Sequence, residues 1–313
     1  MVKFDIKRSM TRSEIAEVTE LLNVVERADG QRPLSDHLWI DLSHGARAGF
    51  AGLTAWQTGI NHPIAYCQVS RGNDSWAIDL VVDPRNRNEF AELGLSLFLE
   101  ATQIIASEGG GHVHWWVSRQ TTTHTNLALQ IGLRPERNIL QMRVDLPLTQ
   151  LVIKQTKTIL TQEFRVGIDE EIWIKVNNRA FVNHPEQGGW TGEILKLREA
   201  EPWFNPNDFL MHFSGRPVDN QLVGFCWTKV DAATKPVLGE IYAIAVDPLH
   251  HGQGLGRALT VAGLNHLAGR GMTTGMLFVD KVNLPAIKMY SKIGFRTHHE
   301  EQAFVGDIAS SAK

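Results

Sequence analysis

The sequence predicts an α/β fold present in two tandem copies, and three observations support this. Strand-like and helical segments alternate in the same order in both halves of the chain. The length of 313 residues suits two domains of roughly 150 residues each. IDLVVDP (78–84) matches YAIAVDP (242–248) at an offset of 164, and IGLRP (131–135) matches IGFRT (293–297) at an offset of 162. Ordered echoes at a nearly constant spacing indicate an internal duplication.

Apolar periodicity places the elements of each half. In the first half we expect helices at 12–30, 34–45, 90–108 and 126–136, and strands at 47–56, 63–70, 75–82 and 111–118. In the second half we expect helices at 169–182, 255–269 and 284–293, and strands at 208–215, 221–230, 237–246 and 274–280. We therefore divide the chain into an N-terminal domain (1–145), a linker (146–162) and a C-terminal domain (163–313).

Composition and charge favour an ordinary globular protein. The chain is 43% hydrophobic and 21% charged, with a formal net charge of -3, so nothing electrostatic indicates nucleic acid or an anionic membrane as a partner. Its N-terminus lacks the apolar core of a signal peptide, and no run approaches the roughly 20 apolar residues of a membrane span. Two cysteines argue against a disulfide framework. We expect a cytoplasmic monomer.

The segment Gly239–Arg257, GEIYAIAVDPLHHGQGLGR, predicts a strand, a glycine-rich turn and a helix. Asp247-Pro248 ends the strand, and alternate glycines then expose backbone N–H groups at a helix N-terminus, an arrangement that binds phosphate. The turn fits neither the complete G-x-G-x-x-G of a dinucleotide fold nor a Walker loop. An ordinary strand–turn–helix remains the plain alternative to a pyrophosphate site.

Two motifs at the expected separation resemble the GNAT acetyltransferase superfamily. V-D-P-x-x-H-x-x-G-x-G-R-A (246–258) is similar to its acetyl-CoA loop, with His251 where Gln or Arg is usual. Further on, N-x-x-A-x-x-x-Y-x-x-x-G-F (283–295) is similar to its final helix and strand. The resemblance implies a mixed, mostly antiparallel sheet flanked by helices in each half, with acetyl-CoA as co-substrate. The acetyl-CoA contacts that it implies are Ile244, Ala245, Val246, His251, Gly252, Gln253, Gly254, Leu255, Gly256, Arg257, Asn283, Leu284, Pro285, Ala286, Ile287 and Lys288.

A narrower resemblance covers both halves and is densest from about 165 to 305. NRAFVNHPEQGGWT (178–191), EPWFNPNDFL (201–210) and GFCWTK (224–229) are similar to the mycothiol synthase family. Members of that family are tandem GNAT enzymes that acetylate the cysteinyl amine of cysteinyl-glucosaminyl-inositol, the last step of mycothiol biosynthesis. The resemblance implies substrate contacts at Asp36, Glu186, Lys229, Glu240 and Phe278, with Phe278 where the family often has tyrosine. As plain alternatives, Glu186 only shapes its turn and Lys229 is a solvated charge.

Glu240 and Tyr290 are the predicted catalytic residues. An amine must be neutral to attack a thioester, and the reference pKa of an α-amine is about 7.7–8.0, so a base at the start of the strand helps. Tyr290, on the final helix, would protonate the departing thiolate. The plain alternatives are a solvated strand carboxylate for Glu240 and core packing for Tyr290. The family resemblance implies direct transfer without an acyl-enzyme, and Cys226, the nearest candidate nucleophile, has no triad-like partner in sequence.

The first half lacks these groups. The offset of 164 sets Trp76 opposite Glu240, and the offset of 162 sets Ala128 opposite Tyr290. Its turn, PRNRNEFAELG (84–94), has one glycine and two glutamates that repel phosphate. We therefore predict a non-catalytic N-terminal domain in which acetyl-CoA binding is in doubt.

Three other functions are compatible with parts of the sequence: a metal site, acetylation of another amine, and acyl-CoA sensing. Histidines at 112 and 114 and the cluster at 298–301 have no third ligand at a recognisable spacing, so we expect no metal. A GNAT enzyme for another small amine is the nearest rival, and an acyl-CoA sensor without turnover is the rival from another class. Glu240 with Tyr290 disfavours the sensor, and HPEQGGWT with Lys229 disfavours other amines.

Overall fold

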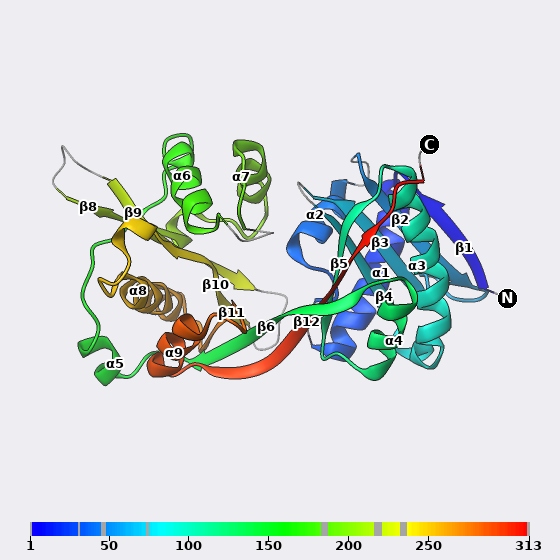
Figure 1. Cartoon of the computed structure of the whole chain (residues 1–313). Helices are drawn as coiled ribbons and strands as arrows, with labels where there is room; N and C mark the ends of the chain where they lie inside the picture. Colours follow the sequence, from blue (N-terminus) through cyan, green and yellow to red (C-terminus); the bar gives the residue numbers. More distant parts are fainter. Residues whose placement is uncertain are drawn as a thin grey trace. The chain divides into compact units, whose positions relative to one another are not determined.

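The computed structural model describes residues 2–30, 32–44, 48–72, 75–182, 187–215, 221–231 and 237–311. The chain forms two compact units, and Figure 1 shows helices on both faces of the sheet in each. Unit 1 contains Met1–Asn138 and Glu300–Lys313, and unit 2 contains Ile139–His299. Each is described by itself.

Unit 1 is a mixed sheet between two helical layers. Its strands are β1 (Val2–Lys7), β2 (Phe50–Gln57), β3 (Ala65–Arg71), β4 (Trp76–Val82) and β5 (Gly111–Ser118), and its helices are α1 (Arg12–Asp29), α2 (Asp36–His44), α3 (Phe90–Ser107) and α4 (Thr122–Gln130). The strands lie in the order β1-β2-β3-β4-β5, antiparallel except for the parallel pair β4–β5. One core packs under α1 and α2, and another under α3 and α4.

The helices of unit 1 follow local rules. Thr11 and Glu14 form a capping box at the start of α1, and Gly30 ends the helix with a φ of 71°. Val18, Leu21, Leu22 and Val25 recur at the helical period and are buried. Residues Pro84–Ser107 are long and apolar enough to cross a membrane by length and composition alone. The α3 part of that segment buries Leu97 and Phe98 in the core of unit 1, as the core helix of a globular domain does.

Unit 2 repeats the plan. Its strands are β7 (Gln162–Glu163), β8 (Phe209–Ser214), β9 (Gln221–Asp231), β10 (Leu238–Val246) and β11 (Thr274–Asp280), and its helices are α5 (Gln150–Lys154), α6 (Glu170–Ala180), α7 (Gly192–Glu199), α8 (Leu255–Gly269) and α9 (Leu284–Ile293). The order is β11-β10-β9-β8-β7, with the parallel pair β10–β11 in the place of β4–β5. Helices α8 and α9 cover one face, and α6 and α7 the other.

The last strand of each half completes the sheet of the opposite unit. Strand β6 (Arg134–Asp145) comes from the first half, and its residues 139–145 pair antiparallel with β11. Strand β12 (Arg296–Ile308) comes from the second half, and its residues 301–308 pair antiparallel with β5. The sequence repeat and the compact units therefore divide the chain differently. Residues of the predicted linker lie in unit 2, where Leu146 and Leu148 join the core.

Most expected elements are present, and the differences have physical reasons. The short helix running into a turn that was predicted at 126–136 is present as α4, which ends at Gln130, but the turn is shorter than expected because Arg134 already belongs to β6. Six of the helices and strands named above were not assigned from local patterns: β1, β6, α5, β7, α7 and β12. Strands such as β6 are stabilised by partners more than 100 residues away, which a short window of sequence does not contain.

Candidate active site

The site begins where two parallel strands of unit 2 separate. Among the described residues, the ladder between β10 and β11 consists of Gly239 opposite Gly275 and Glu240 opposite Met276. Beyond Glu240 the side of β10 next to β11 is open, and Tyr242, Ile244, Ala245 and Val246 are half-buried. An incompletely paired edge inside a sheet leaves room for a ligand between the strands.

A β-bulge changes which faces the residues of β10 occupy. Ile241 pairs with Thr228 and Ala243 with Trp227, so Tyr242 is the extra residue. Ile241 packs against α8 and α9, whereas Tyr242 and Ala243 both pack on the side of α6 and α7. Glu240, two residues before the extra one, shares the face of Tyr242.

The bulge also corrects the sequence alignment. In unit 1, the parallel pair is Trp76 opposite Val113 and Ala77 opposite His114, and β3–β4 pair without a bulge. Matching the two ladders sets Ala77, not Trp76, at the position of Glu240. The predicted equivalence was wrong by one residue because the bulge adds one residue to β10. Unit 1 still lacks a carboxylate at this position.

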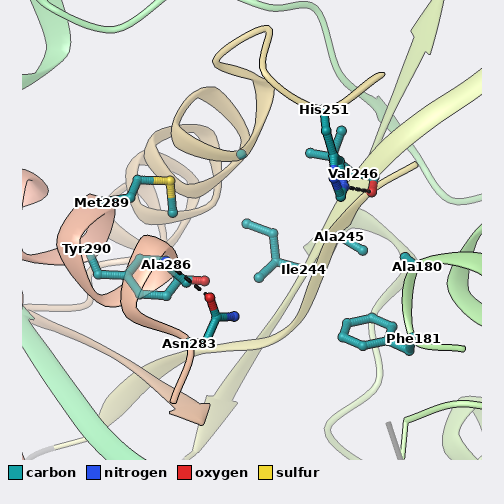
Figure 2. Close-up of a pocket in the computed structure, with 11 residues that line it drawn as sticks. Ala180, Phe181, Ile244, Ala245, Val246, His251, Asn283, Ala286, Met289 and Tyr290 are labelled. Carbon is teal, nitrogen blue, oxygen red and sulfur yellow. Dashed lines mark hydrogen bonds between the residues drawn. The ribbon is translucent and has the colours of Figure 1, made fainter. Parts of the chain in front are cut away.

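A cavity of about 280 Å³ opens at this split. Figure 2 shows Met289 and Tyr290 extending from α9 toward Ile244 of β10, with Phe181 beyond the end of α6 on the opposite side. The lining residues are Ala180, Phe181, Ile244, Ala245, Val246, His251, Gly256, Asn283, Ala286, Met289 and Tyr290. The cavity therefore joins the glycine-rich loop to the predicted acid, Tyr290.

Backbone geometry explains the glycines of the loop. Gly252 and Gly254 have φ values of 77° and 75°, in the left-handed region that favours glycine, and Gly254 is the N-cap of α8. Gly256 needs no such freedom, and an added Cβ would meet only Met289 Sδ at 3.7 Å. The neighbouring protein atoms therefore do not demand glycine at 256, which suits close approach of a ligand to this backbone.

Hydrogen bonds fix the approach to the loop. Asp247 is buried and pairs with Arg179 of α6, and its Oδ1 accepts from the N–H of Leu249 at 3.1 Å. His251 Nε2 donates to the carbonyl of Val246 at 3.0 Å, so its ring lies against the end of β10. Asn283 caps α9 by accepting from the N–H of Ala286 at 3.2 Å.

The predicted acetyl-CoA residues fall into three groups. Seven of them line the cavity: Ile244, Ala245, Val246, His251, Gly256, Asn283 and Ala286. Gly252, Gln253, Gly254, Leu255 and Arg257 form the loop and the first turn of α8, where the Leu255 side chain is buried and Arg257 Nε donates to Thr156 Oγ1 at 3.0 Å. Leu284, Pro285, Ile287 and Lys288 belong to α9 outside the lining.

Three lining residues were missed from sequence: Ala180, Phe181 and Met289. The first two lie in the NRAF segment that carried the family resemblance, and Met289 immediately precedes Tyr290. Proximity to these motifs was the available signal.

Tyr290 is 7% exposed and packs edge-on against Phe295, with the ring centroids 5.6 Å apart. Burial raises the pKa of its phenol, with a smaller contribution from Cys226. The hydroxyl is protonated at neutral pH, as a phenol normally is, and the raised pKa makes it a weaker acid. Glu240 is half-buried at the start of the strand split.

The predicted substrate residues are unequally described. Lys229 of β9 is 4% exposed and lies opposite Glu240 in the register. Phe278 of β11 is 39% exposed. Asp36 is the first residue of α2, but its side chain is outside the description, and Glu186 lies outside the described residues.

Burial disfavours Cys226 as a nucleophile. Cys226 is fully buried, and burial raises the pKa of its thiol to about 12, so the nucleophilic thiolate is scarce at neutral pH. Among the residues that the structure describes, no three His, Cys, Asp or Glu side chains are grouped to hold a metal ion.

Comparison with known proteins agrees with this geometry. Residues 173–295 match the acetyltransferase (GNAT) family. A tandem GNAT protein from the clavulanic acid biosynthesis pathway superposes with a TM-score of 0.72 over 100% of both chains at 12% identity. A GCN5-related N-acetyltransferase from Sphaerobacter thermophilus superposes with a TM-score of 0.70 at 21% identity, over 99% of this chain and 97% of that one. These likenesses confirm the predicted fold, and fold and site together define an acetyl-CoA-dependent acyltransferase of the tandem GNAT class.

The sequence comparison narrows the class. A mycothiol acetyltransferase from Acidimicrobium ferrooxidans is 36% identical over 298 residues, which cover 94% of each chain. The chain therefore belongs to the mycothiol acetyltransferase family.

Proposed function

We propose that this chain transfers the acetyl group of acetyl-CoA to the cysteinyl amine of cysteinyl-glucosaminyl-inositol. The observation that carries this proposal is the cavity of about 280 Å³ lined by both the glycine-rich loop and Tyr290. A pyrophosphate held at the N-terminus of α8 would lead its pantetheine arm along β10 toward the split. The acceptor is the one that the resemblance to the mycothiol synthase family implies.

Glu240 and Tyr290 would move the protons of this reaction. Glu240 accepts a proton from the amine as nitrogen attacks the acetyl carbon, and the amide forms as the carbon–sulfur bond breaks. Tyr290 donates its phenolic proton to the departing thiolate. At neutral pH the phenol is protonated when the thiolate leaves, but burial raises its pKa and makes it a weaker acid, so its position beside the departing sulfur must compensate. The exposed fraction of Glu240 leaves it open to the acceptor at the start of the split.

Lys229 and Phe278 of unit 2 would contact the acceptor; for Asp36 and Glu186 only the family resemblance suggests such a contact. Lys229 is supported by its place opposite Glu240 on the neighbouring strand. The two side chains project from the same face, because directly paired residues of an antiparallel ladder do so. A hydroxylated acceptor bound at Lys229 would thus lie near the base.

The test is release of free CoA thiol with cysteinyl-glucosaminyl-inositol, compared with polyamines, an aminoglycoside and a peptide N-terminus. We expect fast release with the first acceptor and little with the others. Preference for another amine would overturn the substrate assignment, and no release with any amine would leave an acyl-CoA sensor. Calorimetric titration with acetyl-CoA should give one equivalent per chain, and two equivalents of similar affinity would contradict a single cofactor site.

A further inference from the structure

Lys229 is buried among aromatic rings. It is 4% exposed, and its Nζ lies 4.7 Å from the ring centroid of Trp203 and 5.5 Å from that of Tyr242. Both distances are within the range of about 6 Å in which an aromatic face attracts a cation. Two rings from different parts of the chain therefore meet one ammonium group.

The β-bulge brings one of these rings to Lys229. Tyr242 is the extra residue of β10, and it packs on the side of the sheet that faces α6 and α7. Lys229 lies opposite Glu240 on the same face. The ring of Tyr242, the ammonium of Lys229 and the carboxylate of Glu240 thus belong to one short stretch of two paired strands.

Further contacts fix the two rings. Arg198 Nε of α7 donates to the Tyr242 hydroxyl at 3.0 Å. The ring centroids of Trp203 and Tyr242 are 5.0 Å apart, and the fully buried Trp227 packs against both, at 5.8 and 5.1 Å. The rings are thus braced by the sheet and by α7, and they can hold the lysine in one position.

We propose that Trp203 and Tyr242 are positioning residues, which hold the Lys229 ammonium beside Glu240 so that it meets the hydroxylated part of the acceptor. The inference rests on the proposed role of Lys229 in binding that acceptor. Attraction to an aromatic face is electrostatic, so an ammonium held against the two rings can still donate hydrogen bonds to hydroxyl oxygens. The two rings also order the long lysine side chain before the acceptor binds, which lowers the entropic cost of binding.

The test compares Trp203→Leu with Trp203→Phe, which keeps an aromatic face. Trp203→Leu should raise the acceptor KM about tenfold, the size expected for a partly desolvated cation–π contact, while kcat and acetyl-CoA affinity stay within about twofold. Trp203→Phe should restore most of the acceptor KM. Phe204→Leu is the matched control, because Phe204 is the adjacent aromatic and packs on Trp227 at 5.8 Å. It should leave the acceptor KM unchanged.

A double-mutant cycle separates positioning from packing. Lys229→Met should itself raise the acceptor KM, and adding Trp203→Leu should then produce no further increase. Two results would overturn the positioning role. One is an equal rise in acceptor KM for Trp203→Leu and Phe204→Leu. The other is a double variant whose rise in KM equals the product of the rises in Lys229→Met and Trp203→Leu. If Lys229→Met leaves the acceptor KM unchanged, the proposed role of Lys229 is wrong, and so is the positioning role of Trp203 and Tyr242. If Lys229→Met raises the acceptor KM and Trp203→Leu does not, only the positioning role of the aromatic rings is wrong.

Discussion

The two units share one scaffold. Unit 2 has an open cleft in its sheet, whereas the equivalent space within unit 1 is filled by that unit's own side chains. Strand β4 is buried along its whole length, whereas the last three residues of β10 are half-buried beside a cavity. The equivalent glycines differ in the same way. A Cβ at Gly94 would lie 2.7 Å from both Leu127 and Leu80, whereas one at Gly256 would meet Met289 Sδ at 3.7 Å.

Side chains decide whether the separation of two parallel strands becomes a ligand site. Both units limit their described parallel ladder to two residue pairs. Leu127 fills the position beside Gly94 and is 2% exposed, whereas its counterpart Met289 lines the cavity. Unit 2 additionally has the bulge and Glu240, where unit 1 has a regular strand and Ala77. A shared backbone therefore does not imply a shared activity.

The largest expected effect comes from making unit 2 resemble unit 1 at the proposed base. Glu240→Gln should lower kcat by about 10²–10⁴, the usual contribution of a general base, with little change in acetyl-CoA affinity. Glu240→Ala, which copies Ala77, should behave alike. Steady-state kinetics and titration of acetyl-CoA measure both quantities. Full turnover in Glu240→Gln would remove the assigned role.

Tyr290→Phe should have the next largest effect, and it copies the absence of a hydroxyl at Ala128. We expect kcat to fall about 10- to 100-fold. The fall is smaller than for Glu240 because a thiolate, with a reference thiol pKa of about 8.5, leaves with modest assistance. The phenylalanine keeps the packing against Phe295, so the melting temperature serves as the control. Unchanged kcat would assign Tyr290 to packing alone.

The two glycines should respond oppositely to alanine. Gly256→Ala should weaken acetyl-CoA binding about tenfold without loss of stability, because the new Cβ enters the cavity instead of the core. Gly94→Ala should lower the free energy of unfolding by about 1–3 kcal/mol through overpacking, with acetyl-CoA affinity unchanged. Titration and denaturant unfolding of both variants measure the pair. Weaker acetyl-CoA binding in Gly94→Ala would mean that unit 1 takes part in the cofactor site.

The smallest expected effect concerns Asp79, a buried carboxyl in unit 1 where unit 2 has Ala243. Burial raises the pKa of Asp79 to about 8. Because the folded pKa exceeds the unfolded value of about 3.9, the cost of ionising Asp79 grows as the pH rises toward 8. Asp79→Asn should therefore stabilise the protein at pH 8, and the gain should shrink as the pH falls and vanish near pH 4.

Asp83→Asn is the opposite control for the same unfolding experiment. Hydrogen bonds from Arg85 lower the pKa of Asp83. Its stabilisation is present above the unfolded pKa and is lost as the pH falls through the lowered folded value. The asparagine variant should thus be less stable near neutral pH and approach the parent at acidic pH. A gain for Asp79→Asn that does not change with pH would show that ionisation is not its cause.

Local patterns in the sequence predicted much of this molecule. The period of apolar residues located α1, β4, β10 and α8 to within a few residues, because burial on one face leaves a repeat in the chain itself. The alternate glycines located the loop before α8, and two of them have the positive φ that the turn needs. The repeat predicted two copies of one fold.

Other features depend on which distant segments meet. The exchange of β6 and β12, the bulge at Tyr242 and the meeting of Trp203 with Lys229 follow from strand pairing and side-chain packing. The bulge is defined by the pairing of β10 with β9, so the offset counted along the sequence aligned Trp76 with Glu240 and was wrong by one residue. The repeat, the glycine turn and the family's chemical groups can all be read from the sequence alone. Which unit has an open cleft depends on the packing of the folded chain, because each split is filled or left empty by side chains that belong to other elements.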